Sequence, residues 1–320
     1  MRIEEFTQLL LNETNRLLAE KGIDCTATLT SVLKSNDLAK TGICIKRKGS
    51  DIGPNLYLDQ IYPRFEAGED LSDLVGELLD TFLQSEKEAQ PDTEIFDMSY
   101  DKIKDMLRVR VVDKESNRKY LQTVLNIEIA DSGLVFVPEI RMNKDGGFWS
   151  AVITNALADA HGYDRDDVLI QAVNNTVEQD PPSLFYLSRA VFEYEDSSNN
   201  LLDADSPINP EPLVLTSKSR QFGAYAMLQR FVLDRIAELV GPFHILPSSR
   251  HELIIMPDSF NADEDHLRAM VHEANRTVVS PEDFLSNDIF AFSESDGLRR
   301  CSEKILKEKT QHAFVAERNY

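Results

Sequence analysis

Two short apolar runs, at residues 243–246 and 253–256, are separated by the polar sequence PSSRHE. In the second run, residues 253 and 255 point to one side of a strand and residues 254 and 256 to the other. All four are apolar, which is typical of a central strand covered on both faces. Pro247 cannot donate a hydrogen bond to a sheet, so it ends the first run. The pattern predicts adjacent antiparallel strands at 243–246 and 252–256, connected through residues 247–250.

The residues around these runs predict both helices and strands. Apolar side chains recur at helical spacing in residues 3–21, 71–89, 219–241 and 263–277, and Asp164 is placed to cap a further helix. Strand-like runs occupy residues 25–34, 41–48, 213–217 and 288–293. This order predicts an α/β or α+β fold in which helices pack on a mixed sheet.

A chain of 320 residues is long enough for two subdomains. Residues 194–212 are rich in Asp, Asn, Ser and Pro, as expected of a linker or a long surface loop. We therefore expect an N-terminal α+β subdomain at 1–200 and a C-terminal α/β subdomain at 211–300. Residues 301–320 are expected to form a terminal helix or a tail.

The formal net charge of the chain is −21. Because such an excess of acid repels nucleic-acid phosphates and anionic membranes, neither is an expected partner. Residues 51–100 carry 13 acidic and 2 basic residues, a net charge of −11. Acidic runs of this kind are most often the solvated faces of helices, although an acidic face can also mimic nucleic acid.

The three cysteines, Cys25, Cys44 and Cys301, form no close pair. This spacing argues against a disulfide framework and against a cysteine-based metal site, and it indicates a reducing compartment. No stretch reaches the roughly 18 apolar residues of a membrane span. The N-terminus has acidic residues beside only a short apolar run, unlike a signal peptide. We expect a cytoplasmic protein.

The polar sequence between the two apolar runs has two interpretations. Proline and serine are common in turns, since serine hydroxyls bond nearby backbone groups. The pair His251-Glu252 is harder to explain, because a buried strand seldom begins with two such side chains unless both have partners. We therefore predict a functional binding surface made of Ser248, Ser249, Arg250, His251 and Glu252, joined by Asn275 and Arg276 from the following helix.

No complete catalytic, metal or cofactor motif occurs in the chain. His251-Glu252 begins like the HExxH zinc motif, but position 255 is Ile and the segment is a predicted strand. His272-Glu273 lies on a predicted helix and is followed at the ligand position by Arg276. The serines lack the GxSxG elbow, and no glycine-rich phosphate loop is present. The sequence thus predicts no metal, no cofactor and no assigned catalytic residue.

The C-terminal third is similar to an uncharacterised bacterial family of unknown function. The resemblance rests on Leu246, Pro247, Ser248, Ser249, His251 and Glu252, and then on Asn275, Thr277, Pro281, Glu282, Leu285 and Ser286. The sequence departs from that family's pattern at Asn287-Asp288, and at Ser217, where Asn is usual. The resemblance is good over residues 212–292 and predicts a whole-chain relationship, but it implies no activity.

Three functions remain open at this point. The leading hypothesis is a non-enzymatic interaction or regulatory protein with a protein partner. The second is a hydrolase that uses Ser248 or Ser249, His251 and a carboxylate such as Glu252 or Glu273. The third is an acidic inhibitor that mimics nucleic acid in the basic groove of a nucleic-acid-binding enzyme. The oligomeric state does not follow from the sequence.

Overall fold

The computed structural model describes residues 2–47, 55–88, 98–129, 132–144, 147–192 and 200–301. Contacts divide the chain into two compact units, residues 1–99 and residues 100–320. The boundary expected near residue 200 falls within the second unit and stays a prediction. Of the helix or tail expected at 301–320, only Cys301 is described, and residues 193–199 of the expected linker also lie outside the described part.

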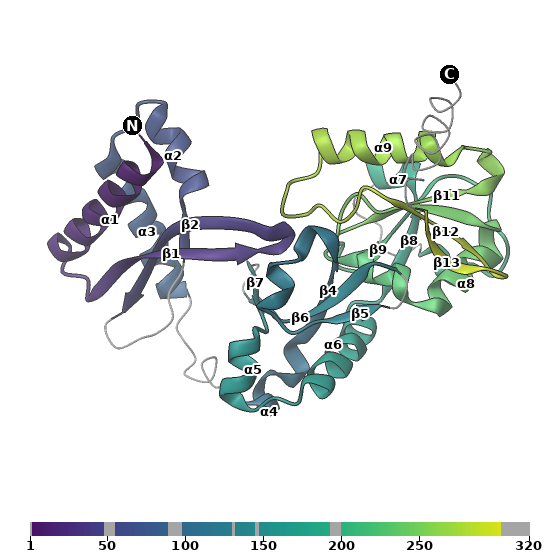
Figure 1. Ribbon diagram of the computed structural model, residues 1–320, viewed down its shortest axis with the longest axis horizontal. Coiled ribbons are helices and arrows are strands. Elements are labelled where there is room, and N and C mark those ends of the chain that lie inside the picture. Colours follow the sequence, from purple (N-terminus) through teal and green to yellow (C-terminus); the bar gives the residue numbers. More distant parts are fainter. Residues whose placement is uncertain are drawn as a thin grey trace, which may run out of the picture. The chain divides into compact units, whose positions relative to one another are not determined.

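The first unit is a three-stranded antiparallel sheet packed against helices (Figure 1). Its elements are α1 (Ile3–Glu20), β1 (Cys25–Lys34), β2 (Leu38–Arg47), β3 (Asn55–Tyr57), α2 (Leu58–Glu66) and α3 (Leu71–Glu88). The predicted helices at 3–21 and 71–89 and the predicted strands at 25–34 and 41–48 are confirmed over their described residues, which leave out residues 48 and 89. One face of each helix meets the sheet in a core that includes Phe6, Leu10, Ile43, Ile45 and Leu79.

The second unit begins with an antiparallel sheet in the order β4-β6-β5, with β7 also paired to β6. Its elements are α4 (Tyr100–Ile103), β4 (Leu107–Asp113), β5 (Ile127–Ile129), β6 (Leu134–Lys144), β7 (Gly147–Val152), α5 (Asn155–His161) and α6 (Arg165–Gln179). Asp164 caps α6 as predicted, since its carboxylate accepts from the backbone N–H groups of residues 166 and 167 at 3.0 Å.

Helix α6 also satisfies backbone groups of β4. Thr176 Oγ1 accepts from the Val109 N–H at 2.9 Å, and Asn175 Nδ2 donates to the Leu107 carbonyl at 3.0 Å. Both side chains are buried. Polar helix residues therefore take the place of a further strand along this edge, which fixes the position of β4 against α6.

A six-stranded sheet forms the rest of the second unit, in the order β13-β12-β10-β11-β9-β8. Its strands are β8 (Pro182–Tyr186), β9 (Leu213–Ser217), β10 (Phe243–Leu246), β11 (Leu253–Pro257), β12 (Ile289–Ser293) and β13 (Gly297–Cys301). Its helices are α7 (Leu187–Phe192), α8 (Arg230–Val240) and α9 (Glu264–Thr277). Every strand pairing among the described residues is antiparallel, and the fold is α+β.

The predicted hairpin is confirmed. Strands β10 and β11 pair antiparallel with Phe243 opposite Pro257 and Leu246 opposite Ile254. Strand β11 also pairs with β9, so it is the central strand that its apolar residues predicted. Helix α9 covers the face that carries Leu246 and Ile289, and the alternate residues of β10 and β12 are buried as well.

The single helix predicted at 219–241 is wrong. A 3-10 helix at Gly223–Leu228 is separated from α8 by Gln229, whose backbone is extended (φ −97°, ψ 104°). Phe231, at the start of α8, is 58% exposed. The cause lies at Gly223, where an added Cβ would meet the Ser217 nitrogen at 2.4 Å. The segment lies directly against β9, and the left-handed backbone of Arg220 and Phe222 (φ 59° and 55°) also interrupts an α-helix here.

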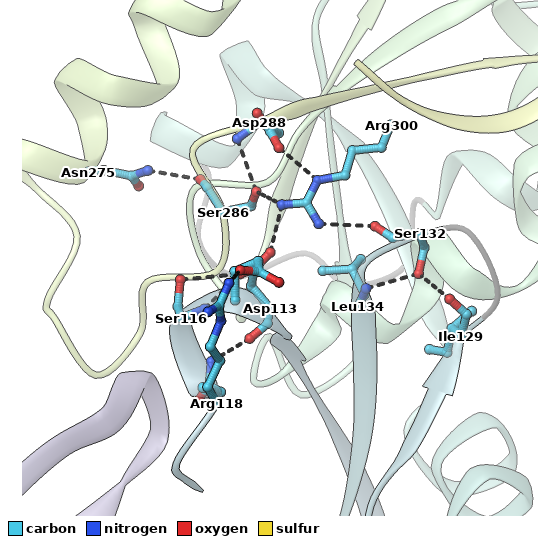
Figure 2. A network of polar contacts seen from close by, with 12 residues as sticks. Asp113, Ser116, Arg118, Ile129, Ser132, Leu134, Asn275, Ser286, Asp288 and Arg300 are labelled. Carbon is cyan, nitrogen blue, oxygen red and sulfur yellow. Dashed lines mark hydrogen bonds and ion pairs between the residues drawn. The ribbon is translucent and has the colours of Figure 1, made fainter. Parts of the chain in front are cut away.

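One arginine side chain joins the two sheets of the second unit (Figure 2). Arg300, on β13, donates to the Asp113 carboxylate at the end of β4 at 2.7 Å and to the Asp288 carboxylate at 2.7 Å. It also donates to the Ser132 carbonyl, just before β6, at 3.2 Å. These contacts fix the four-stranded sheet relative to the six-stranded sheet.

Candidate functional site

The polar connection between β10 and β11, residues 247–251, is tied to a second segment of the chain, residues 280–288. The Arg250 N–H donates to the Asp283 carbonyl at 2.9 Å. The carbonyls of Ser248 and Pro247 accept from residues 285 and 286, each at 3.1 Å. The connection is therefore not an isolated turn, because it pairs with a segment that follows α9.

His251 is bonded through both ring nitrogens. Its Nδ1 accepts from the Phe222 backbone N–H at 3.1 Å, which places the ring proton on Nε2, where it is donated to Asp283 Oδ1 at 3.0 Å. Burial lowers the pKa of His251, although the hydrogen bond to Asp283 opposes this effect. The imidazole is thus neutral near pH 7 and holds two distant segments together.

Both serines accept hydrogen bonds from backbone N–H groups. Ser249 Oγ accepts from the His251 N–H at 3.0 Å, and Ser248 contributes its carbonyl to residue 285. A serine nucleophile needs a histidine nitrogen that accepts its proton. Since Nδ1 and Nε2 of His251 are occupied by Phe222 and Asp283, this geometry does not favour the hydrolase hypothesis.

Among the other predicted residues, Asn275 is linked to the same region, whereas Glu252 is exposed. Asn275 Nδ2 donates to the Ser286 carbonyl and to Asn287 Oδ1, both at 2.9 Å. Arg276 is 74% exposed and pairs with Glu273 at 2.8 Å. The structure thus brings Asn275 to the segment that holds residues 247–251, with Arg276 beside it on α9.

Asn275 and Arg276 line an open groove with a volume of about 830 Å³. We call it the α9 groove. Its lining consists of α9 residues and of the segment that follows: Asp265, Arg268, Ala269, His272, Glu273, Asn275, Arg276, Phe284 and Asn287. Phe284 forms a β-bridge with Ser249, so the polar connection supports one wall of the groove.

A second cluster lies around Phe222, and sequence patterns did not single it out. The guanidinium carbons of Arg141, Arg250 and Arg110 lie 4.4, 4.9 and 5.2 Å from the centroid of the Phe222 ring. The His251 ring is 4.8 Å away. We call this set the Phe222 cluster.

Glu139 is a buried carboxylate that contacts two arginines of the Phe222 cluster. It is 0% exposed and pairs with Arg110 and, at 2.5 Å, with Arg141. These residues alternate with apolar ones along β4 and β6, in the sequences RVRVV and PEIRM. Such alternation normally marks a solvated sheet face. In this chain the face is buried, and Phe222 stacks on its arginines.

Burial has a strong effect on the arginines. It lowers the pKa of Arg110 and of Arg141 to about 10. Both groups remain charged at neutral pH. A charge that is nearly enclosed by protein is costly unless it is paired and fully hydrogen-bonded, and Glu139 supplies only part of that compensation, because Arg110 Nε has no acceptor among the described residues.

Comparison with known proteins gave one result. The model of a family of unknown function, DUF5688, matches residues 3–294. The chain belongs to this family. The match extends over nearly the whole chain and confirms the predicted relationship to an uncharacterised family, whereas the particular C-terminal motif stays a prediction. No curated protein and no solved structure matched.

In the part of the chain that the structure describes, no helix combines the length and apolar character needed to span a bilayer. Across the same residues, no group of three or more His, Cys, Asp or Glu side chains is placed to hold a metal ion.

Proposed function

We propose that this protein is a non-enzymatic interaction protein and that the α9 groove binds a peptide segment of a partner protein. The observation that carries the proposal is Asn275 Oδ1. This acceptor is buried in the groove lining and receives no hydrogen bond from the described residues, while the Nδ2 group of the same amide is fully used. A backbone N–H of a bound peptide would satisfy it once the buried amide turns toward the groove.

The charges of the groove support a peptide ligand. Arg268 pairs with Asp265 and Arg276 pairs with Glu273 along α9, so the groove holds both signs in a chain whose net charge is −21. A groove of mixed charge suits a polar peptide better than it suits a nucleic acid, which needs a basic surface. The cytoplasmic location inferred from the cysteines stays a prediction.

Affinity capture from a native host lysate, followed by quantitative mass spectrometry, tests the proposal. The bait is the full chain, as wild type and as Arg276→Glu. Arg118→Glu is a matched control, because Arg118 pairs with Glu115 at i−3 and is 69% exposed, while Arg276 pairs with Glu273 at i−3 and is 74% exposed.

The expected result is a protein retained in stoichiometric amount by the wild type and by Arg118→Glu and lost from Arg276→Glu. Equal capture by all three baits would place the binding surface outside the groove. If the wild type captures no protein in stoichiometric amount, the interaction hypothesis is contradicted and the hydrolase hypothesis is favoured.

A further inference from the structure

The Phe222 cluster joins three segments of the chain. Arg110 comes from β4, Arg141 from β6, and Arg250 from the connection between β10 and β11. All three guanidinium groups lie within 5.2 Å of one ring that is itself 6% exposed. One aromatic face satisfies a guanidinium by a cation–π contact, but three cations around one ring also repel one another.

The backbone of Phe222 is held in an unfavourable conformation. Its φ and ψ are 55° and 27°, in the left-handed region that bulky L-residues rarely adopt. Three hydrogen bonds from residues 222–224 to the polar connection hold it there, the first to His251 Nδ1 and the other two to the carbonyls of His251 and Arg250. Strain that is held by several contacts is a mark of functional sites.

Two carboxylates, Glu139 and Asp283, contact the Phe222 cluster, but they do not accept from all of its N–H donors. The two oxygens of Glu139 are taken by Arg110 and Arg141. Asp283 Oδ1 accepts from both Arg250 and His251, and Oδ2 accepts from Ser280. Arg110 Nε and Arg250 Nε are buried and have no hydrogen-bond partner among the described residues. Two N–H donors on cationic groups are therefore left over beside Phe222.

Charges farther from the ring do not remove this excess of donors. Glu282 attracts Arg110 and Asp180 attracts Arg141, but these are longer-range interactions. Asp180 already accepts from the backbone N–H and the hydroxyl of Ser219, both at 2.7 Å. The cluster still lacks an acceptor at the two Nε positions.

We propose that Arg110, Arg141 and Arg250 around Phe222 form a binding site for a small oxyanion, a carboxylate or a phosphate monoester. Planar guanidinium groups recognise both by charge-assisted hydrogen bonds. The side chains of His251 and Asp283 beside the cluster are 29% and 33% exposed, whereas Arg110 and Arg141 are 10% and 8% exposed, so we infer that a ligand enters past His251 and Asp283. The Asp283 carboxylate occupies Arg250 and must swing aside for the ligand to reach the buried donors.

This arrangement predicts opposite effects of two substitutions. Asp283→Asn removes the negative charge that competes for Arg250, so it strengthens oxyanion binding. Arg250→Met removes a donor and a charge while it keeps an apolar side chain against Phe222, so it weakens binding about tenfold or more. Arg118→Met, at an arginine that is 69% exposed and lies outside both proposed sites, is the control and leaves binding unchanged.

Two titrations of the full chain test the site, one with inorganic phosphate and one with succinate, at an ionic strength held constant with chloride. Calorimetry gives affinities, and ¹⁵N NMR follows the arginine Nε–H signals. Saturable binding of phosphate alone identifies a phosphate ligand, and binding of succinate alone identifies a carboxylate. Binding of both supports a general oxyanion site.

Several results would contradict the proposal of an oxyanion site. One is the absence of a saturable response to either probe. Another is wild-type affinity in Arg250→Met. A third is weaker binding in Asp283→Asn. If Arg250→Met does not fold, the NMR titration of the wild type and the affinity of Asp283→Asn still test the proposed site. None of these results depends on the α9 groove.

Discussion

Arg300 and Asp113 lie 187 positions apart in the chain, and their side chains meet at 2.7 Å (Figure 2). Asp113 is 2% exposed. It lies at the end of a strand in one sheet, and Arg300 lies on the last described strand of the other. The two sheets of the second unit are therefore joined by a nearly enclosed ion pair that also includes Asp288.

Arg300→Ala is expected to lower the free energy of unfolding by about 3 kcal/mol, because it leaves the Asp113 carboxylate buried and unpaired. Chemical denaturation measures the change. Arg299→Ala is the neighbouring control: Arg299 is 54% exposed and pairs with Glu264, so its loss costs about 1 kcal/mol or less. Equal losses in the two variants would show that the contact with Asp113 adds nothing beyond a surface pair.

Ser249→Ala is expected to lower the free energy of unfolding by about 1 kcal/mol, the size of one lost hydrogen bond. The Ser249 hydroxyl accepts this bond from the His251 N–H. The midpoint of thermal unfolding reports the loss. Ser259→Ala, at an exposed position before α9, is the control and should be neutral. If Ser249→Ala instead raises the midpoint, the hydroxyl is retained for binding at a cost in stability.

The neutral state of His251 predicts a dependence of stability on pH. Burial lowers the pKa of His251 below the ordinary value of about 6.5. Between these two values the unfolded chain binds more protons than the folded one, so the free energy of unfolding falls as the pH falls through this range.

His251→Asn keeps an acceptor for the Phe222 N–H but cannot titrate. We expect its pH profile to be flatter than that of the wild type just below pH 6.5, as measured by urea denaturation at a series of pH values. His266→Asn, at an exposed position on α9, is the control. Parallel profiles for the wild type and His251→Asn would mean that other groups produce the slope.

Two glycine substitutions should act in opposite directions. At Gly223 an added methyl group would meet backbone atoms of Thr216 and Ser217 at 2.4–2.6 Å, so Gly223→Ala is expected to cost about 3 kcal/mol. At Gly76, within α3, an added methyl group meets nothing within 4 Å, and Gly76→Ala is expected to stabilise the first unit by about 0.5–1 kcal/mol. Calorimetry of each variant measures both effects.

The sequence was sufficient for the elements whose apolar residues repeat regularly. The hairpin of β10 and β11 followed from two apolar runs and one proline, and Asp164 marked the start of α6 by its side chain alone. The break at Gln229 was not predictable in this way. It depends on how closely Gly223 approaches β9, which is a property of the tertiary structure.

The candidate site was predicted in part. His251 was singled out because a histidine at the start of a buried strand needs partners, and the structure supplies them in Phe222 and Asp283. Arg110 and Arg141 were missed because arginines that alternate with valine or isoleucine look like the solvated face of a strand. Phe222, far along the chain, covers that face, and a contact at this sequence separation is not visible in the strand's own pattern.

The ion pair of Arg300 and Asp113 also bears on the order in which the protein folds during synthesis. The first unit has its own core and can fold while the rest of the chain is still being translated. The second unit cannot complete its structure until β13 has left the ribosome, because Arg300, the partner of Asp113, is synthesised 187 residues after it. A stalled ribosome that holds a chain ending before β13 therefore carries a protease-resistant N-terminal unit followed by a protease-sensitive remainder.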